Sequence, residues 1–252
     1  MQKAQGHWIL AKMGKKVLRP GGKELTRKLI NGLSINSKSE VVEFAPGLGY
    51  TASLVAEKKP KTYTGVELDE NAAELLRKKL NAPNQKIVTG NAAGSGLAES
   101  SANVVYGEAM LTMQADHRKS EIIKEAYRLL KPGGLYGIHE LSLDNSTDEN
   151  SKAEIQRELA LAIKVNARPL TKNEWKVLLE NEGFKIRKVM TNPMSLLEPK
   201  RVIDDEGLLR AIKIGVNILT HPDARKRILN MRKIFHKYRE QLGAIAIVAE
   251  KI

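Results

Sequence analysis

The sequence predicts an α/β fold in which a doubly wound parallel sheet carries helices on both faces. Short apolar runs of strand length alternate with longer segments whose apolar residues recur at helical spacing. The first three runs each end in small or polar residues suited to contacting a ligand. Seven strands are predicted, at residues 41–45, 62–67, 86–89, 103–106, 135–139, 184–190 and 244–249.

Helices are predicted between these strands. The segment 114–130 shows an amphipathic period, and a second helix begins at Thr171, which forms a capping-box pattern with Glu174. Residues 153–165 predict a further helix. Between the last two strands, the segment 192–242 has helical apolar spacing on both sides of a break at residues 221–222.

A small-residue turn follows the first strand. Gly47 and Gly49 allow the backbone to approach a ligand closely before a helix begins. Glu67 lies twenty residues beyond Gly47 and ends the second apolar run, where a carboxylate can accept hydrogen bonds from both hydroxyls of an adenosine ribose. The turn also fits the dinucleotide fingerprint, so by itself it leaves a nicotinamide-dependent oxidoreductase open.

Three neighbouring features bear on that choice. Glu43 stands before the turn, where its charge would repel a pyrophosphate but could hold a cationic amino group. Asn91 ends the third apolar run with an amide suited to an adenine edge. The predicted helix 114–130 closes with a Lys-Pro-Gly-Gly sequence at 131–134, directly before the fifth strand.

With these motifs in this order, the chain resembles the class I S-adenosylmethionine-dependent methyltransferases, most nearly the small-molecule group called methyltransferase type 11. The resemblance covers about residues 38–143. It rests on the turn at 43–49, on Glu67, on the loop 90–92 and on residues 131–134.

Two positions depart from the family pattern. Ala45 stands where the first glycine is usual, and Asn91 stands where an aspartate is common. Alanine is still small, and asparagine can donate and accept at adenine. The resemblance therefore still implies a Rossmann-like seven-stranded sheet with helical cap insertions, and S-adenosyl-L-methionine as the cofactor.

The resemblance also implies the site residues. The expected cofactor-binding positions are Glu43, Ala45, Pro46, Gly47, Gly49, Thr51, Glu67, Leu68, Gly90, Asn91, Ala92 and Glu108. The expected catalytic residues are Glu108, after the fourth strand, and His139 with Glu140, after the fifth. Histidine can take a proton at neutral pH, and a neighbouring carboxylate could orient it or hold a cationic acceptor.

Three parts are predicted in the chain: an amino-terminal helical cap over the cofactor site at 1–34, a methyltransferase core at 35–191 and 243–252, and a helical insertion at 192–242. In the implied fold the substrate lies beyond the carboxyl ends of the strands, where inserted helices form a cap. The insertion could instead pack on the sheet edge or dimerise. Lys15 and Arg19 could meet an anionic substrate group, or simply face water.

Composition narrows the chemistry. The 252 residues include no cysteine, which excludes disulfides, thiolate metal sites and cysteine nucleophiles. The five histidines are scattered without ligand spacing, so no metal is predicted. No stretch approaches the ~20 apolar residues of a membrane span, and no signal-peptide hydrophobic region follows the start, so a cytoplasmic location is predicted.

The formal net charge of +13 is compatible with an anionic partner such as RNA, DNA or a membrane surface. It could equally serve only to keep the protein soluble. Aromatic residues make up only 4% and do not interleave with the basic clusters, which disfavours a single-stranded nucleic acid. The predicted function is methyl transfer from S-adenosylmethionine to a small-molecule acceptor by a monomer or homodimer. RNA methyltransferase is the first alternative, followed by an NAD(P)-dependent oxidoreductase and by a protein that only senses S-adenosylmethionine.

Overall fold

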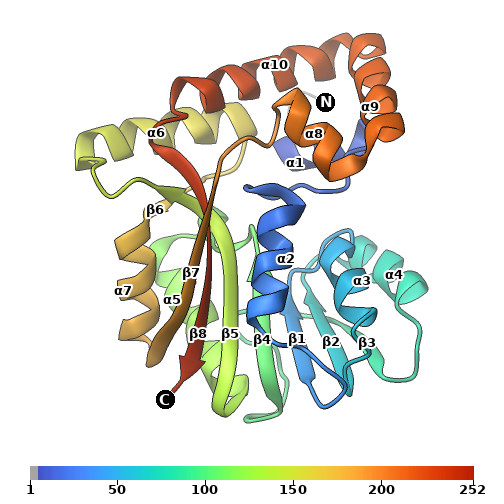
Figure 1. Ribbon diagram of the computed structural model, residues 1–252, viewed down its shortest axis with the longest axis vertical. Coiled ribbons are helices and arrows are strands. Elements are labelled where there is room, and N and C mark those ends of the chain that lie inside the picture. The colour runs from blue at the N-terminus through green and yellow to red at the C-terminus, as the bar shows by residue number, and fades with distance from the viewer. Residues whose placement is uncertain (1–4) are drawn as a thin grey trace.

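The computed structural model describes residues 5–252 and has a single mixed sheet at its centre (Figure 1). The strand order is β3-β2-β1-β4-β5-β8-β7, and β6 pairs with β5 off this path. The strands are β1 (Glu40–Phe44), β2 (Thr62–Glu67), β3 (Gln85–Thr89), β4 (Ala102–Glu108), β5 (Leu130–Leu143), β6 (Leu170–Thr171), β7 (Phe184–Pro193) and β8 (Leu242–Lys251). The predicted α/β class is confirmed, with eight strands instead of seven because two-residue β6 adds a pairing.

The direction of the strands determines where a ligand can lie. Strands β1 to β5 run parallel, and β8 is antiparallel to both β5 and β7. The strand order reverses between β1 and β4, so their carboxyl ends diverge there and leave a crevice. Phe44 and Glu108 end these two strands.

The central strands are buried because helices cover both faces of the sheet. Residues 244–249 of β8 form an apolar run without alternation, and all of them are buried. Strand β5 begins at Leu130, five residues before the predicted start. Its pairing with β4 jumps from Ala102 with Leu130 to Val104 with Leu135, so the glycine-containing segment 131–134 bulges out of the ladder.

Two groups of helices form the outer layers. On one face lie α2 (Gly22–Gly32), α3 (Tyr50–Ala56) and α4 (Glu70–Lys79), and on the other lie α5 (Asp116–Leu129) and α7 (Lys172–Asn181) (Figure 1). Helix α7 has the predicted capping box: the Thr171 hydroxyl accepts from the Glu174 backbone N–H, and the Glu174 carboxylate accepts from that of Thr171. Its Trp175 is fully buried.

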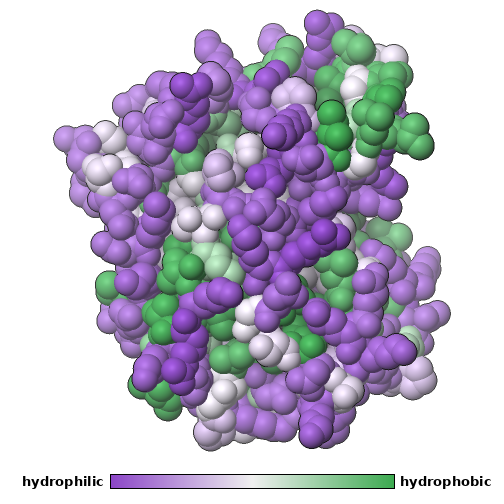
Figure 2. Space-filling model, in the orientation of Figure 1, coloured by the Kyte–Doolittle hydropathy of each residue, from purple (hydrophilic) through white to green (hydrophobic). Residues whose placement is uncertain are grey.

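The remaining helices form a cap at one end of the sheet (Figure 1): α1 (Gly6–Lys12), α6 (Glu149–Ile163), α8 (Pro199–Glu206), α9 (Leu208–Thr220) and α10 (Pro222–Lys237). They share an apolar core of their own. The predicted helices within 192–242 and near 153–165 are therefore present. The division of the chain into three parts stays a prediction, and residues 1–4 of its first part lie outside the described residues. Figure 2 shows apolar side chains gathered over the outer side of α9.

An amino-terminal strap, residues 13–21, joins α1 to α2 and is fastened to α8. The Glu206 carboxylate accepts hydrogen bonds from the backbone N–H groups of Lys16 and Val17, both at 2.8 Å. Asp205 accepts from the backbone N–H of Lys23, at 2.9 Å. Charged side chains of the insertion thus position the strap over the end of the sheet.

Within residues 5–252, no helix combines the length and the apolar content that crossing a bilayer requires.

Candidate active site

A cavity of about 680 Å³ lies between the carboxyl ends of the strands and the cap. Its walls come from the strap and α1, from the loops after β1, β2 and β4, and from cap residues as distant in the chain as Phe235. The cavity therefore lies at the crevice that the strand order predicts. Eight predicted site residues help to line it: Ala45, Pro46, Gly47, Glu67, Leu68, Glu108 and Glu140, with Arg19 from the strap.

The glycine turn and Glu67 are joined directly. One Glu67 carboxylate oxygen accepts from the backbone N–H of Gly47 at 2.9 Å, and the other accepts from that of Asp69 at 3.1 Å. Gly47 has a φ of +56°, and a Cβ built there would meet nothing nearer than the Ala45 carbonyl oxygen at 4.0 Å. The space over this turn is open, so a ligand can approach the backbone.

Two alanines beside the cavity have strained backbones. Ala45 has a φ of +51° and Ala109 a φ of +53°, in the left-handed region that L-residues other than glycine adopt only at a cost. They directly follow β1 and β4 and line the cavity. The conformation at Ala45 explains why a glycine is common at this place in the family that the sequence resembles.

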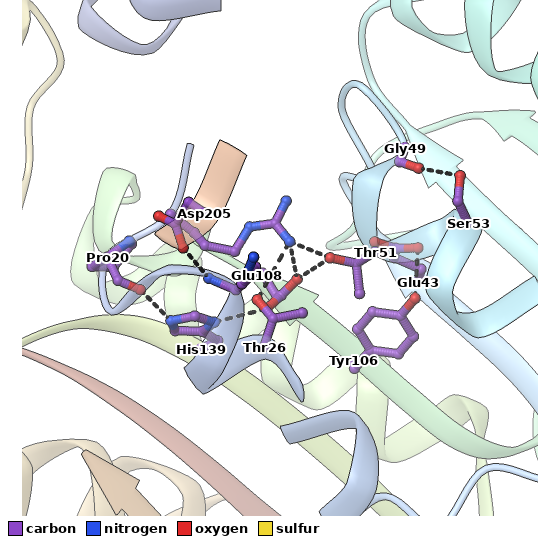
Figure 3. Close-up of polar contacts among 12 residues, drawn as sticks. Pro20, Thr26, Glu43, Gly49, Thr51, Ser53, Tyr106, Glu108, His139 and Asp205 are labelled. Carbon is purple, nitrogen blue, oxygen red and sulfur yellow. Dashed lines mark hydrogen bonds and ion pairs between the residues drawn. The ribbon is translucent and has the colours of Figure 1, made fainter. Parts of the chain in front are cut away.

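Glu108 is the centre of a buried polar network (Figure 3). One carboxylate oxygen accepts from Arg19 Nη1 at 2.8 Å and from the Thr51 hydroxyl, and the other accepts from the Thr26 hydroxyl at 2.7 Å. Burial would raise the pKa of this carboxyl, but the Arg19 charge and the hydrogen bonds from His139 and Thr51 outweigh it and lower the pKa to about 2. Glu108 is therefore ionised and ties the strap to β4, α2 and α3.

His139 lies behind Glu108 and has no exposed surface. Its Nε2 lies 2.5 Å from the Pro20 carbonyl oxygen, which can only accept, so Nε2 carries a proton (Figure 3). Its Nδ1 lies 2.7 Å from a carboxylate oxygen of Glu108. The ring does not line the cavity, and both of its nitrogens contact protein groups, so its observed contacts position Glu108 and the strap. Its catalytic role stays a prediction.

Glu140 lines the cavity, but its carboxylate accepts hydrogen bonds from backbone N–H groups. It accepts from the N–H groups of Met110, Leu111 and Thr112 and from the Thr112 hydroxyl, at 2.7–3.0 Å. These residues lead into and form the short 3-10 helix η1 (Leu111–Met113). Burial raises the pKa of Glu140, and these four hydrogen bonds oppose that rise. Its catalytic role stays a prediction; its observed contacts position η1.

Glu43 is 3% exposed and does not line the cavity. One of its oxygens accepts from the Tyr63 and Tyr106 hydroxyls, at 2.5 and 2.6 Å. Burial raises its pKa to about 7 despite these bonds. The observed partners of Glu43 are two tyrosine hydroxyls, and its contact with a cationic amino group stays a prediction. Tyr63 lies on β2 and Tyr106 lies on β4, and no sequence motif marks either tyrosine.

Five further predicted cofactor positions lie outside the cavity lining: Gly49, Thr51, Gly90, Asn91 and Ala92. Gly49 caps α3 with a φ of +70°. The Asn91 side-chain oxygen accepts from the backbone N–H of Ala93 at 3.0 Å, which orders its own loop. Their roles in cofactor binding stay predictions.

The cap end of the cavity is mostly apolar, a feature that no sequence motif predicted. Four methionines line it together with other apolar residues, and the ten residues come from six separate segments: Met110, Met113, Met194, Met231, Leu10, Leu18, Leu141, Ile163, Leu196 and Phe235. Trp8 of α1 lies at this end and is 36% exposed. Unbranched methionines adapt to ligands of varied shape.

The lining suits an adenosyl amino acid at its strand end. Glu67 offers a carboxylate beside an open glycine turn. Arg19 uses only Nη1 for its hydrogen bonds among residues 5–252, so Nε and Nη2 remain as donors. A ribose and a carboxylate are the groups that such residues bind.

Comparison with known proteins identifies the family of the chain. The family described as a methyltransferase domain matches residues 42–138. An uncharacterised Haemophilus influenzae protein is 34% identical over 250 residues, which cover 98% of each chain. A phosphoethanolamine N-methyltransferase of Plasmodium falciparum is 23% identical over 218 residues, covering 79% of this chain and 82% of that one.

Among solved structures, Haemonchus contortus phosphoethanolamine N-methyltransferase 2 in complex with S-adenosyl-L-methionine superposes with a TM-score of 0.72. The match covers 98% of this chain and 56% of that one at 14% identity, so it bears on the fold alone.

Proposed function

Because the chain belongs to the class I S-adenosylmethionine-dependent methyltransferases, we propose that its methyl acceptor is a small organic molecule with an apolar body. The observation that carries this proposal is the apolar cap end of the cavity. The family match also removes the reason for the oxidoreductase alternative, which rested on the glycine turn alone.

The strand end of the cavity is proposed to hold S-adenosylmethionine. Glu67 would accept from the ribose hydroxyls, and the free Arg19 donors would bind the carboxylate of the amino acid portion. Glu108 lies beside Arg19 and fixes its guanidinium. Arg19 also lies over the Tyr50 ring, with its Cζ 5.0 Å from the ring centroid, which restricts the side chain further.

The cap end is proposed to take the acceptor. A phosphorylated acceptor needs several cationic donors. The cationic side chains that line this cavity are Lys16 and Arg19, and the free donors of Arg19 are assigned to the carboxylate of the cofactor. The observed walls therefore favour an apolar body over the phosphoethanolamine named for the Plasmodium relative.

The bound cofactor supplies an electrophilic methyl group on a sulfonium sulfur. The protein's own part is positioning and exclusion of water, which contribute most of the rate in a transfer of this kind. Glu140 holds η1 and so places Met110 and Met113 against the acceptor space. Apolar walls around the reacting groups keep water out.

The test is a methyl-transfer assay with radiolabelled S-adenosylmethionine and a panel of acceptors, each sharing one nucleophile but differing in the size of the apolar body. Rates are expected to rise with apolar size, and phosphoethanolamine is expected to be a poor acceptor. Transfer confined to phosphoethanolamine or to RNA would overturn the proposal.

A variant pair sharpens the assay. Met113→Lys places a charge at the acceptor wall and should raise the KM for an apolar acceptor by about tenfold or more, because that charge loses hydration on acceptor binding. Its affinity for S-adenosylhomocysteine should stay near the wild-type value. Val189→Lys changes an apolar residue that is 40% exposed on β7, outside the cavity, and should alter neither quantity.

A further inference from the structure

The outer face of α9 exposes a row of large apolar side chains. Leu208, Leu209, Ile212, Val216 and Leu219 are 60, 85, 56, 52 and 65% exposed. Their spacing places them on one side of the helix, and Figure 2 shows the patch that they form. Isolated exposed apolar residues are ordinary, whereas a continuous apolar helix face indicates an interaction surface.

The inner face of the same helix is firmly packed. Ile214 is 4% exposed and belongs to the core of the cap. The Asn217 side-chain amide donates to the Met13 carbonyl oxygen of the strap, at 3.0 Å. Helix α9 is therefore already held in place, and its outer apolar row has no role in packing the cap.

The charge around this face is of one sign. Between residues 207 and 222 the charged side chains are Arg210 and Lys213, and no acid occurs. Within residues 5–252, neither Lys213 nor the nearby Arg225 and Lys226 of α10 lies within ion-pairing distance of a carboxylate, while Arg210 lies 3.9 Å from Glu206. The insertion 192–242 as a whole contains eleven Lys and Arg residues against six Asp and Glu.

We propose that the outer face of α9 docks on an anionic lipid surface. An apolar row with Lys213 at its edge, on a segment rich in basic residues, matches a bilayer interface, where leucine side chains enter the acyl boundary and lysines meet anionic headgroups. A second copy of the chain fits this face less well, because a self-paired interface would bring the Lys213 side chains of the two copies close to each other. The surface lies on the cap and does not depend on the identity of the methyl acceptor.

Co-sedimentation of the full chain with vesicles tests this proposal. Vesicles of phosphatidylcholine alone are compared with vesicles that also contain phosphatidylglycerol, at low and high salt. Binding is expected for the anionic vesicles, and it should weaken as salt screens the lysine and arginine charges. Equal binding to neutral vesicles, or none to anionic ones, would overturn the proposal.

Matched variants assign the binding to α9. Leu209→Glu and Lys213→Glu should each weaken vesicle binding by about tenfold, the first by burying a charge and the second by reversing one. Leu161→Glu changes a leucine of α6 that is 62% exposed and should leave binding unchanged. Calorimetric titration with S-adenosylhomocysteine confirms that each variant is folded.

Size-exclusion chromatography with light scattering tests whether a second copy of the chain covers this face instead of a lipid surface. A dimer that forms in wild type and is lost in Leu209→Glu, without vesicle binding in either protein, would assign the face to a second copy and overturn the lipid proposal.

Discussion

The ammonium of Lys15 lies 3.6 Å from a carboxylate oxygen of Asp205, and both side chains are almost completely buried. Burial lowers the pKa of Lys15, and the charges of Asp205 and Glu206 oppose that effect. Lys15 Nζ makes no hydrogen bond in the described residues, so electrostatic attraction alone compensates its loss of hydration. This pair joins the amino-terminal strap, which lines the cavity, to the inserted helix α8.

Asp205→Asn should therefore lower the free energy of unfolding by about 2–3 kcal/mol, because Lys15 keeps its buried charge and retains only Glu206 as a partner. Urea denaturation measures this. Asp204→Asn is the matched control. The Asp204 carboxylate is exposed, so the free energy of unfolding should change by no more than about 0.5 kcal/mol. Equal effects of the two substitutions would contradict a structural role for the buried pair.

Replacement of Glu67 by alanine should weaken binding of S-adenosylhomocysteine by about 1–3 kcal/mol, because charge-assisted hydrogen bonds to the ribose are lost. Calorimetric titration gives this value directly. Glu74→Ala removes an exposed carboxylate from α4 and should leave the affinity as it is in wild type. Unchanged affinity in folded Glu67→Ala would remove Glu67 from the cofactor site.

Ala45→Gly should stabilise the protein by about 0.5–1 kcal/mol, because glycine adopts a φ of +51° without the steric cost that alanine carries. Thermal and urea unfolding would show the gain. Ala52→Gly, inside α3 where φ is helical, should have the opposite sign, about 1 kcal/mol of destabilisation. A loss of stability in both variants would show that Ala45 is not strained in solution.

Glu43 should make stability fall as the pH rises from about 4.5 to about 7. In that interval the folded state keeps the proton that the unfolded state has released, so folding becomes less favourable with increasing pH, by at most about 3 kcal/mol. Denaturation of Glu43→Gln at about pH 5 and about pH 7.5 should show a smaller difference than wild type does. An identical pH dependence in the two proteins would place the Glu43 pKa elsewhere.

His139→Gln separates a positioning role from a catalytic one. If the imidazole only holds Glu108 and Pro20, its loss should weaken binding of S-adenosylhomocysteine at least as much as it lowers kcat, and the pH profile of kcat should keep its shape. A large fall in kcat with unchanged affinity, and loss of a limb of the pH profile, would identify His139 as the base.

The core of the fold was predictable because its signals are local. Short apolar runs, the glycine turn and the Thr171 capping box each act over a few residues, and each is present as expected. Strand β6 was missed because two residues carry no period. The start of β5 was misplaced because a proline-glycine segment normally ends a strand, whereas here it bulges and pairing resumes on both sides.

The site was predictable only in part, for a different reason. Glu67 and Gly47 lie on one motif, and their hydrogen bond follows from it. The environment of Glu43 and His139 depends on Tyr63, Tyr106 and Pro20, which come from other segments and carry no motif. The apolar acceptor wall likewise forms only when α1, η1 and α10 meet. Such contacts are properties of the tertiary fold and have no signature in a short stretch of sequence.

The hydrogen bonds between the strap and α8 determine when, during synthesis, the cavity can close. Lys16 and the Glu206 carboxylate that accepts from its backbone are 190 residues apart, so the ribosome completes the entire parallel part of the sheet before the second partner emerges. A nascent chain can thus build its nucleotide-binding strands early and yet have no closed chamber until α8 is released. Competence to retain the cofactor under the cap is then acquired only after α8 has been synthesised, so a shorter nascent chain does not sequester the cofactor.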